Sequence, residues 1–236
     1  KKKIKIILCV VLSVLYFQLC ALCYAQDDLK KIKQLETQVL SNLKDKKAGS
    51  SLEMLAEMYF IQRQYNSFIE FLRRVDKKKP SACEIPVGYY IALCRYHQLT
   101  HWEETQNWKE YFDLGNEYRQ EVFLETQKLA EACPLSPFGL RAQALNWLLH
   151  KAQNDSLMEA SLTKLMDMVN TYTKSASDSE VLKDIADTLA RNEEKGLAQS
   201  LYKSYVSRLL ENEQVPFKLQ SVAQGALKES NIELAE

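Results

Sequence analysis

The stretch 49-GSSLEMLAEMYFIQRQYNSFIEFLRRVDKKKP-80 contains two apolar patterns separated by a polar break at residues 62–64. The apolar positions are Leu52, Leu55, Ala56 and Tyr59 before the break, and Tyr65, Phe68, Leu72 and Val75 after it. Spacings of three and four residues place each set on one face of a helix. Because Ala56 is small, a second helix can approach closely, and Phe68 and Leu72 can fill the space around it. The stretch therefore predicts two short helices packed against each other.

Counted from Gly49, the large, small and turn positions of this stretch resemble those of a tetratricopeptide repeat, although Phe68 stands where that family usually has alanine. The same positions recur at Leu182, Ile185, Ala186, Leu189, Ala198, Tyr202 and Tyr205, and a further step of 37 residues leads to Leu219, Val222, Ala223, Ala226 and Ala235. A fixed period of this size is typical of a solenoid. The resemblance implies an all-α protein, a right-handed α-solenoid of antiparallel helix pairs over residues 49–236. The period exceeds the family's usual length of about 34 residues, so a related helical repeat is an alternative.

The remaining segments are also expected to be helical. Residues 26–48 are expected to form a leading amphipathic helix, with an apolar stripe at Leu29, Ile32, Leu35, Val39 and Leu43, and residues 49–51 to cap the next helix. Equal steps of 37 residues from Tyr59 to Tyr96 and from Tyr65 to Trp102 predict a helix pair over 84–114, whose second helix begins at Trp102. An additional helix is expected over 116–133, followed by a pair over 138–153 and 156–173. The last repeat stops midway through its second helix, which favours an incomplete repeat and a longer protein.

Residues 1–25 have the pattern of a secretory signal peptide. A lysine-rich start is followed by an apolar run over 6–17, and the small Ala25 precedes the polar Gln26. This pattern predicts cleavage after Ala25 and an exported protein, periplasmic or extracellular. Residues 6–25 are also about long enough to span a bilayer, so an uncleaved membrane anchor is an alternative. A lipoprotein modified at Cys20 or Cys23 is less favoured, because leucine precedes both cysteines.

Charge and cysteine content limit the partners and the redox chemistry. Lys plus Arg and Asp plus Glu both number 31, so the chain has no overall basic field for nucleic acid. Three of the six cysteines lie in the leader, and Cys83, Cys94 and Cys133 follow it. An exported location permits one disulfide among these three, and buried free thiols are an equal alternative.

The sequence contains no catalytic signature. A glycine-rich phosphate loop, a nucleophile elbow and spaced cysteine pairs are all missing. His97 and His101 are four residues apart and would share a helix face as metal ligands, but the turn expected before Trp102 would separate them. We therefore expect no catalytic, metal-binding or cofactor-binding residues, and a protein that is not itself an enzyme.

The resemblance implies a function in binding. In tetratricopeptide proteins the first helix of each pair lines a concave face that holds peptides, and here Tyr90 and Arg95 flank the apolar positions of such a helix. These two residues are the candidate peptide groove. The expected function is an exported scaffold that binds a protein or peptide partner in the cell envelope. One alternative is the helical-superhelix portion of an exported cell-wall-acting enzyme whose catalytic domain lies outside this chain. Another is a membrane-anchored assembly factor that retains its leader.

Overall fold

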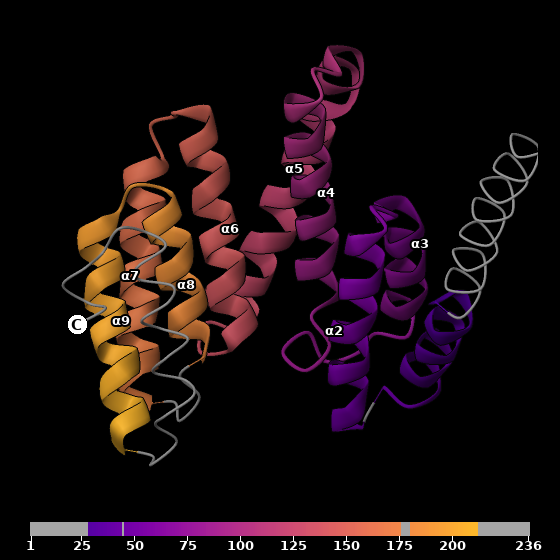
Figure 1. Cartoon of the computed structure of the whole chain (residues 1–236), viewed down its shortest axis with the longest axis horizontal. Helices are drawn as coiled ribbons and strands as arrows, with labels where there is room; N and C mark the ends of the chain where they lie inside the picture. The colour runs from indigo at the N-terminus through magenta and orange to yellow at the C-terminus, as the bar shows by residue number, and fades with distance from the viewer. Residues whose placement is uncertain (1–27, 44, 176–179, 212–236) are drawn as a thin grey trace, which may run out of the picture. The chain divides into compact units, whose positions relative to one another are not determined.

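The computed structural model describes residues 28–43, 45–175 and 180–211, and these residues form helices with no strand among them (Figure 1). The prediction of an all-α protein is therefore confirmed for the described part of the chain. The chain divides into two compact units, Lys1–Pro80 and Ser81–Glu236. None of the described helices is both long and apolar enough to cross a membrane. The predicted leader and the apolar positions at 219–235 lie outside the described residues.

The first unit contains a helix over residues 28–41, followed by α2 (Lys46–Ile61) and α3 (Tyr65–Asp76). Ala56, Phe68 and Leu72 are buried, and the Phe68 ring stacks on Tyr59 with centroids 5.0 Å apart. The two packed helices predicted from residues 49–80 are confirmed, and bulky aromatic side chains fill the space beside the small Ala56.

The helix over residues 28–41 packs onto this pair through the middle of its predicted stripe. Ile32, Leu35 and Val39 are buried, whereas Leu29 is 51% exposed. The Tyr59 hydroxyl donates to Glu36 Oε1 at 2.9 Å. Burial is the main cause that raises the pKa of Tyr59, and its hydrogen bond to Glu36 raises it further.

The start of α2 differs from the sequence expectation. Residues 49–51 do not cap this helix, because α2 already begins at Lys46. Asp45 is the N-cap residue, with extended backbone, and its Oδ1 accepts a hydrogen bond from the Lys47 backbone N–H at 2.9 Å. An aspartate in this position satisfies a free N–H of the first turn, so the later serines are not needed as caps.

The second unit contains α4 (Val87–Glu104), α5 (Trp108–Ala132), α6 (Pro137–Gln153), α7 (Met158–Ser175), α8 (Glu180–Arg191) and α9 (Lys195–Glu211). The pairs α4–α5, α6–α7 and α8–α9 pack side by side (Figure 1). α6 also contacts α4, α5 and α8. A large core joins the last four helices around the fully buried Trp147, Tyr172, Tyr202 and Tyr205.

The boundary between α4 and α5 was predicted wrongly. Trp102 does not begin a second helix, because α4 continues to Glu104 and the next helix starts at Trp108. The Trp102 ring stacks on Tyr118 of α5 with centroids 5.2 Å apart, so this aromatic side chain packs between the two helices. The additional helix expected over 116–133 is the continuation of the 25-residue α5. Gly115 is buried near Leu99 of α4, which indicates that this glycine serves helix packing rather than a break.

Four helices, α2, α4, α6 and α8, end in the same way. At these four ends the residues with left-handed backbone are Arg63, Gln106, Asn154 and Glu193, with φ of 54°, 55°, 49° and 70°. In each case the following N–H bonds to the carbonyl five residues earlier, with acceptors Tyr59, Trp102, His150 and Leu189. This is the Schellman ending of a helix. Tyr59 and Trp102 hold the same place in these endings and are 43 residues apart, which does not match the step of 37 residues expected from the sequence.

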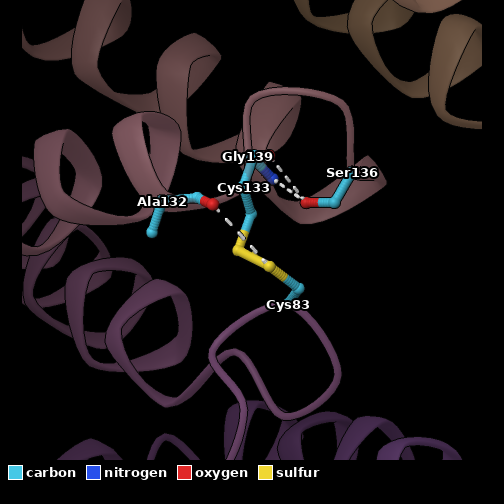
Figure 2. Close-up of a disulfide and its surroundings, with 5 residues drawn as sticks. All are labelled: Cys83, Ala132, Cys133, Ser136 and Gly139. Carbon is cyan, nitrogen blue, oxygen red and sulfur yellow. Dashed lines mark hydrogen bonds between the residues drawn. A yellow bond between two sulfur atoms is a disulfide. The ribbon is translucent and has the colours of Figure 1, made fainter.

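A disulfide joins Cys83 to Cys133, which are separated by 50 residues and have Cα atoms 5.6 Å apart (Figure 2). It ties the loop before α4 to the end of α5. Cys94 is a buried free thiol, and burial raises its pKa. The sequence left open whether the three cysteines that follow the leader form a disulfide. The structure contains one bonded pair, Cys83–Cys133, and one buried free thiol, Cys94.

The corner that holds Cys133 depends on a glycine (Figure 2). Ser136 Oγ accepts from the Gly139 N–H at 2.9 Å and donates to the Cys133 carbonyl at 3.0 Å. A Cβ atom on Gly139 would lie 2.0 Å from that carbonyl oxygen, which is far inside contact distance. Only glycine allows the start of α6 to approach the end of α5 this closely.

Candidate functional site

A cavity of about 220 Å³ lies among α4, α6 and α8, which are the first helices of three successive pairs. Its lining residues are Tyr89, Leu93, Tyr96 and His97 from α4, Arg141, Ala144, Leu145 and Leu148 from α6, and Asp184, Ile185 and Thr188 from α8. Within each helix these positions are mostly three or four residues apart, so each helix presents one face. We call this cavity the first-helix groove.

The walls of the first-helix groove are mainly apolar and aromatic. Leu145 and Ile185 are buried in the core, and Leu93 and Leu148 pack partly buried beside them. The Tyr89 ring contacts Phe138 at the start of α6 with centroids 5.6 Å apart. This arrangement provides an apolar recess that suits an aliphatic or aromatic side chain.

One ion pair crosses the groove between α6 and α8. Arg141 Nε donates to Asp184 Oδ2 at 3.0 Å, and Arg141 Nη2 donates to the same oxygen. The Arg141 guanidinium also lies over the Phe138 ring, 5.2 Å from its centroid. Because both charged side chains are partly exposed, the pair contributes little to stability.

Burial shifts the pKa of two titratable side chains of α4 that line the groove. Burial lowers the pKa of His97, and the negative charge of Glu104 opposes that shift, so the ring is neutral at pH 7. Burial also raises the pKa of Tyr96. His101 lies on α4 and not in a turn, so the turn expected to separate it from His97 was wrong. The described part of the chain contains no group of three His, Cys, Asp or Glu side chains placed to hold a metal ion.

The two residues proposed from the sequence do not line this cavity. Tyr90 is buried, with its ring 6.0 Å from Phe138. Arg95 is only 7% exposed and points toward α5, where its Nε donates to Glu121 Oε2 at 2.6 Å and its guanidinium lies 3.8 Å from the Tyr118 centroid. Arg95 lies as far before the Schellman ending of α4 as the core residue Leu52 lies before that of α2.

Three residues that line the groove were not predicted from the sequence: Arg141, Asp184 and Thr188. The first two are 43 residues apart, and no local pattern marks them as neighbours. A signal for Tyr89 and Tyr96 was present, since both lie on the same face of α4 as Leu93. The 37-residue step put these residues in the wrong register.

A scan against models of protein families finds none that matches this chain, and a search of curated proteins finds no match. The resemblance to tetratricopeptide repeats therefore rests on the residue positions described above.

Proposed function

We propose that this protein is an exported helical-repeat scaffold that binds an apolar segment of a protein or peptide partner in the first-helix groove. The observation that carries the proposal is the groove itself, an apolar recess with a polar rim built from the first helices of three successive pairs. Grooves of this chemistry accept amphipathic helices or extended peptides through a few side-chain anchors.

The proposed architecture is a tetratricopeptide-like, right-handed solenoid of antiparallel pairs. Two observations support it. The four Schellman endings repeat the same backbone geometry at equivalent positions. In addition, α6 contacts both α4 and α8, as expected where the first helices of successive pairs lie next to one another.

The proposed location is the cell envelope or the extracellular space. The Cys83–Cys133 disulfide supports it, because disulfides persist in oxidising compartments. The signal-peptide pattern of residues 1–25 agrees with export. N-terminal sequencing of the exported protein should begin at Gln26, whereas recovery of the intact leader in washed membranes would favour the anchored alternative.

Site-specific photo-crosslinking in cells tests the binding function. A photoreactive phenylalanine analogue at Thr188, on the rim of the groove, is expected to form covalent adducts with a discrete partner. The same group at Lys203, an exposed position of α9, is the matched control. Leu93→Arg, which places a charge in the recess, should abolish the Thr188 adducts while circular dichroism shows an unchanged fold. Identical adducts from both positions, or adducts that survive Leu93→Arg, would remove the groove from consideration.

A further inference from the structure

Three aromatic side chains stand together at the start of α5, and two of them are widely exposed. Trp108 is 45% exposed and Phe112 is 75% exposed, although both are large apolar residues. With Tyr111 they form ring contacts whose centroid distances are 5.8 Å for Trp108–Tyr111, 5.8 Å for Tyr111–Phe112 and 6.4 Å for Trp108–Phe112. We call these three residues the aromatic cluster. Exposed apolar patches mark interaction sites, and tryptophan and tyrosine are enriched among the residues that contribute most to binding.

Neighbouring polar side chains hold the base of the aromatic cluster. The Tyr111 hydroxyl donates to Glu103 Oε1 at 3.2 Å, which ties the cluster to the end of α4. The Arg119 guanidinium lies 4.7 Å from the Tyr111 centroid. Trp108 and Phe112 are four residues apart, so they share one face of the helix. The two exposed rings therefore stand on a fixed base, and they lose little conformational freedom when they bind.

The aromatic cluster matches the first-helix groove in size and polarity. The groove has a volume of about 220 Å³, and its apolar walls include Leu93, Leu145 and Leu148. An engineered cavity of about 150 Å³ in another protein, lined by similar side chains, binds benzene, so the groove has room for one phenylalanine ring. The lining residues come from α4, α6 and α8, and Phe112 is exposed on α5, so the cluster does not fill the groove of its own chain.

The charged groups beside the two features are also complementary. Lys109 and Asp113, which follow the two exposed rings in sequence, are themselves exposed. At the groove, the side chains of Asp184 and Arg141 are 46% and 23% exposed. A carboxylate accepts several hydrogen bonds, so Asp184 can accept a lysine in addition to Arg141. Both surfaces thus carry one cation and one anion beside an apolar centre, which favours docking of one surface on the other.

We propose that the occupant of the first-helix groove is the aromatic cluster of a second copy of this chain. Phe112 enters the recess, Trp108 covers its rim, and Lys109 pairs with Asp184. The contact is heterologous, because the surface that inserts differs from the surface that receives it. Copies therefore associate head to tail, into rings where the rotation closes and into open chains where it does not. This inference rests on the proposed function of the groove and names its partner.

Sedimentation velocity of the purified protein tests self-association. The mean mass is expected to rise above that of one chain as the concentration increases. Phe112→Ala, which removes the inserting ring, should stay at the mass of one chain. Leu124→Ala, which removes another exposed apolar side chain of α5, is the matched control and should associate as the native protein does. A native protein that stays at the mass of one chain, or a Phe112→Ala variant that associates equally, would overturn the inference.

A mixture of two variants decides whether the cluster and the groove meet. Leu93→Arg blocks the groove and keeps the cluster, whereas Phe112→Ala keeps the groove and lacks the ring. Each variant alone should have the mass of one chain. Their equimolar mixture should form a species of two chains and nothing larger, because only one productive contact is available. If circular dichroism shows that Leu93→Arg alters the fold, Thr188→Trp, which fills the groove from its rim, takes its place.

Two results of this experiment contradict the proposed contact. A mixture that stays at the mass of one chain would show that the cluster and the groove do not meet. Self-association of the groove-blocked variant alone would show that clusters pair with each other instead.

Photo-crosslinking separates this inference from the proposed function. With the photoreactive group at Thr188, the purified protein should form adducts whose linked peptide contains Phe112 of another copy. Adducts in cells with a different protein that persist in Phe112→Ala would overturn the second copy as occupant and leave the binding function of the groove standing. Loss of all Thr188 adducts would remove both. Phe112-dependent binding to vesicles of zwitterionic lipid, without self-association, would assign the cluster to a membrane surface and also overturn the inference.

Discussion

Removal of the Cys83–Cys133 disulfide is expected to destabilise the second unit by a large and calculable amount. The change is the double variant Cys83→Ala, Cys133→Ala, in which alanine avoids placing a polar hydroxyl at the buried Cys133. The bond closes a loop across the whole of α4 and α5, so the unfolded chain loses much conformational freedom when the bond is present.

The magnitude follows from the loop length. For a separation of 50 residues, the chain-entropy model assigns about 4 kcal/mol to the cross-link at 25 °C. For a domain of this size that loss corresponds to a decrease in Tm of roughly 10 °C. Residual structure in the unfolded chain would reduce the effect, so about 4 kcal/mol is the upper end of the expected range.

Urea denaturation followed by circular dichroism measures the effect, with and without a reducing agent. Reduction should destabilise the native protein by nearly as much as the double substitution, and should leave the variant unchanged. Mass spectrometry after alkylation provides the direct check on connectivity. Peptides containing Cys83 and Cys133 should be linked before reduction, and the buried Cys94 should be alkylated only after denaturation.

The reasoning would be refuted by equal urea midpoints for the native protein and the double variant under oxidising conditions. A disulfide that includes Cys94 would refute the connectivity, because that thiol is buried within α4 and separate from the bonded pair.

Three further pairs of substitutions test the packing and the turns, each by thermal or urea melts. Ala186→Trp, at a fully buried core position, should lower the free energy of unfolding by about 1–3 kcal/mol. Lys203→Trp, at an exposed position, should change it within about ±0.5 kcal/mol. Equal losses would contradict the assigned helix faces. Gly139→Ala should lower the free energy of unfolding by about 1–3 kcal/mol, because its Cβ would meet a backbone carbonyl. Gly196→Ala, whose Cβ meets nothing within 4 Å, should stabilise α9 by about 0.5–1 kcal/mol. The reverse order would refute the close approach at Gly139. Glu193→Gly should stabilise by about 1 kcal/mol because glycine adopts φ of 70° without strain, and Glu193→Ala should give no gain.

The amino-acid sequence determined the helical pairs by itself wherever one apolar face was continuous. Residues 52–75 and 182–205 were placed correctly because their spacing of three and four residues is a property of a single helix, independent of its neighbours. The turn at Asn154 was also predictable, since asparagine tolerates the left-handed backbone that ends α6.

Tertiary structure decided the register of α4 and α5. Counted back from the Schellman ending, α4 has Arg95 and Gln98 where α2 has Leu52 and Leu55. The apolar pattern of α2 is therefore missing from α4. These polar side chains are buried because each finds a partner within the unit: Arg95 contacts Glu121, and its Nη1 donates to Gln98 Oε1 at 3.0 Å. A periodicity argument counts such residues as exposed, because the partner that permits their burial lies on another helix.

Tertiary structure also decided which cysteines pair and which residues meet in the first-helix groove. Cys83 and Cys133 become neighbours only after α4 and α5 fold back on one another, and Arg141 reaches Asp184 only because α6 packs against α8. Helix formation depends on contacts within a few residues of sequence, so the sequence alone determined it. The groove depends on contacts between residues tens of positions apart, and only the packing of the helices brings those residues together.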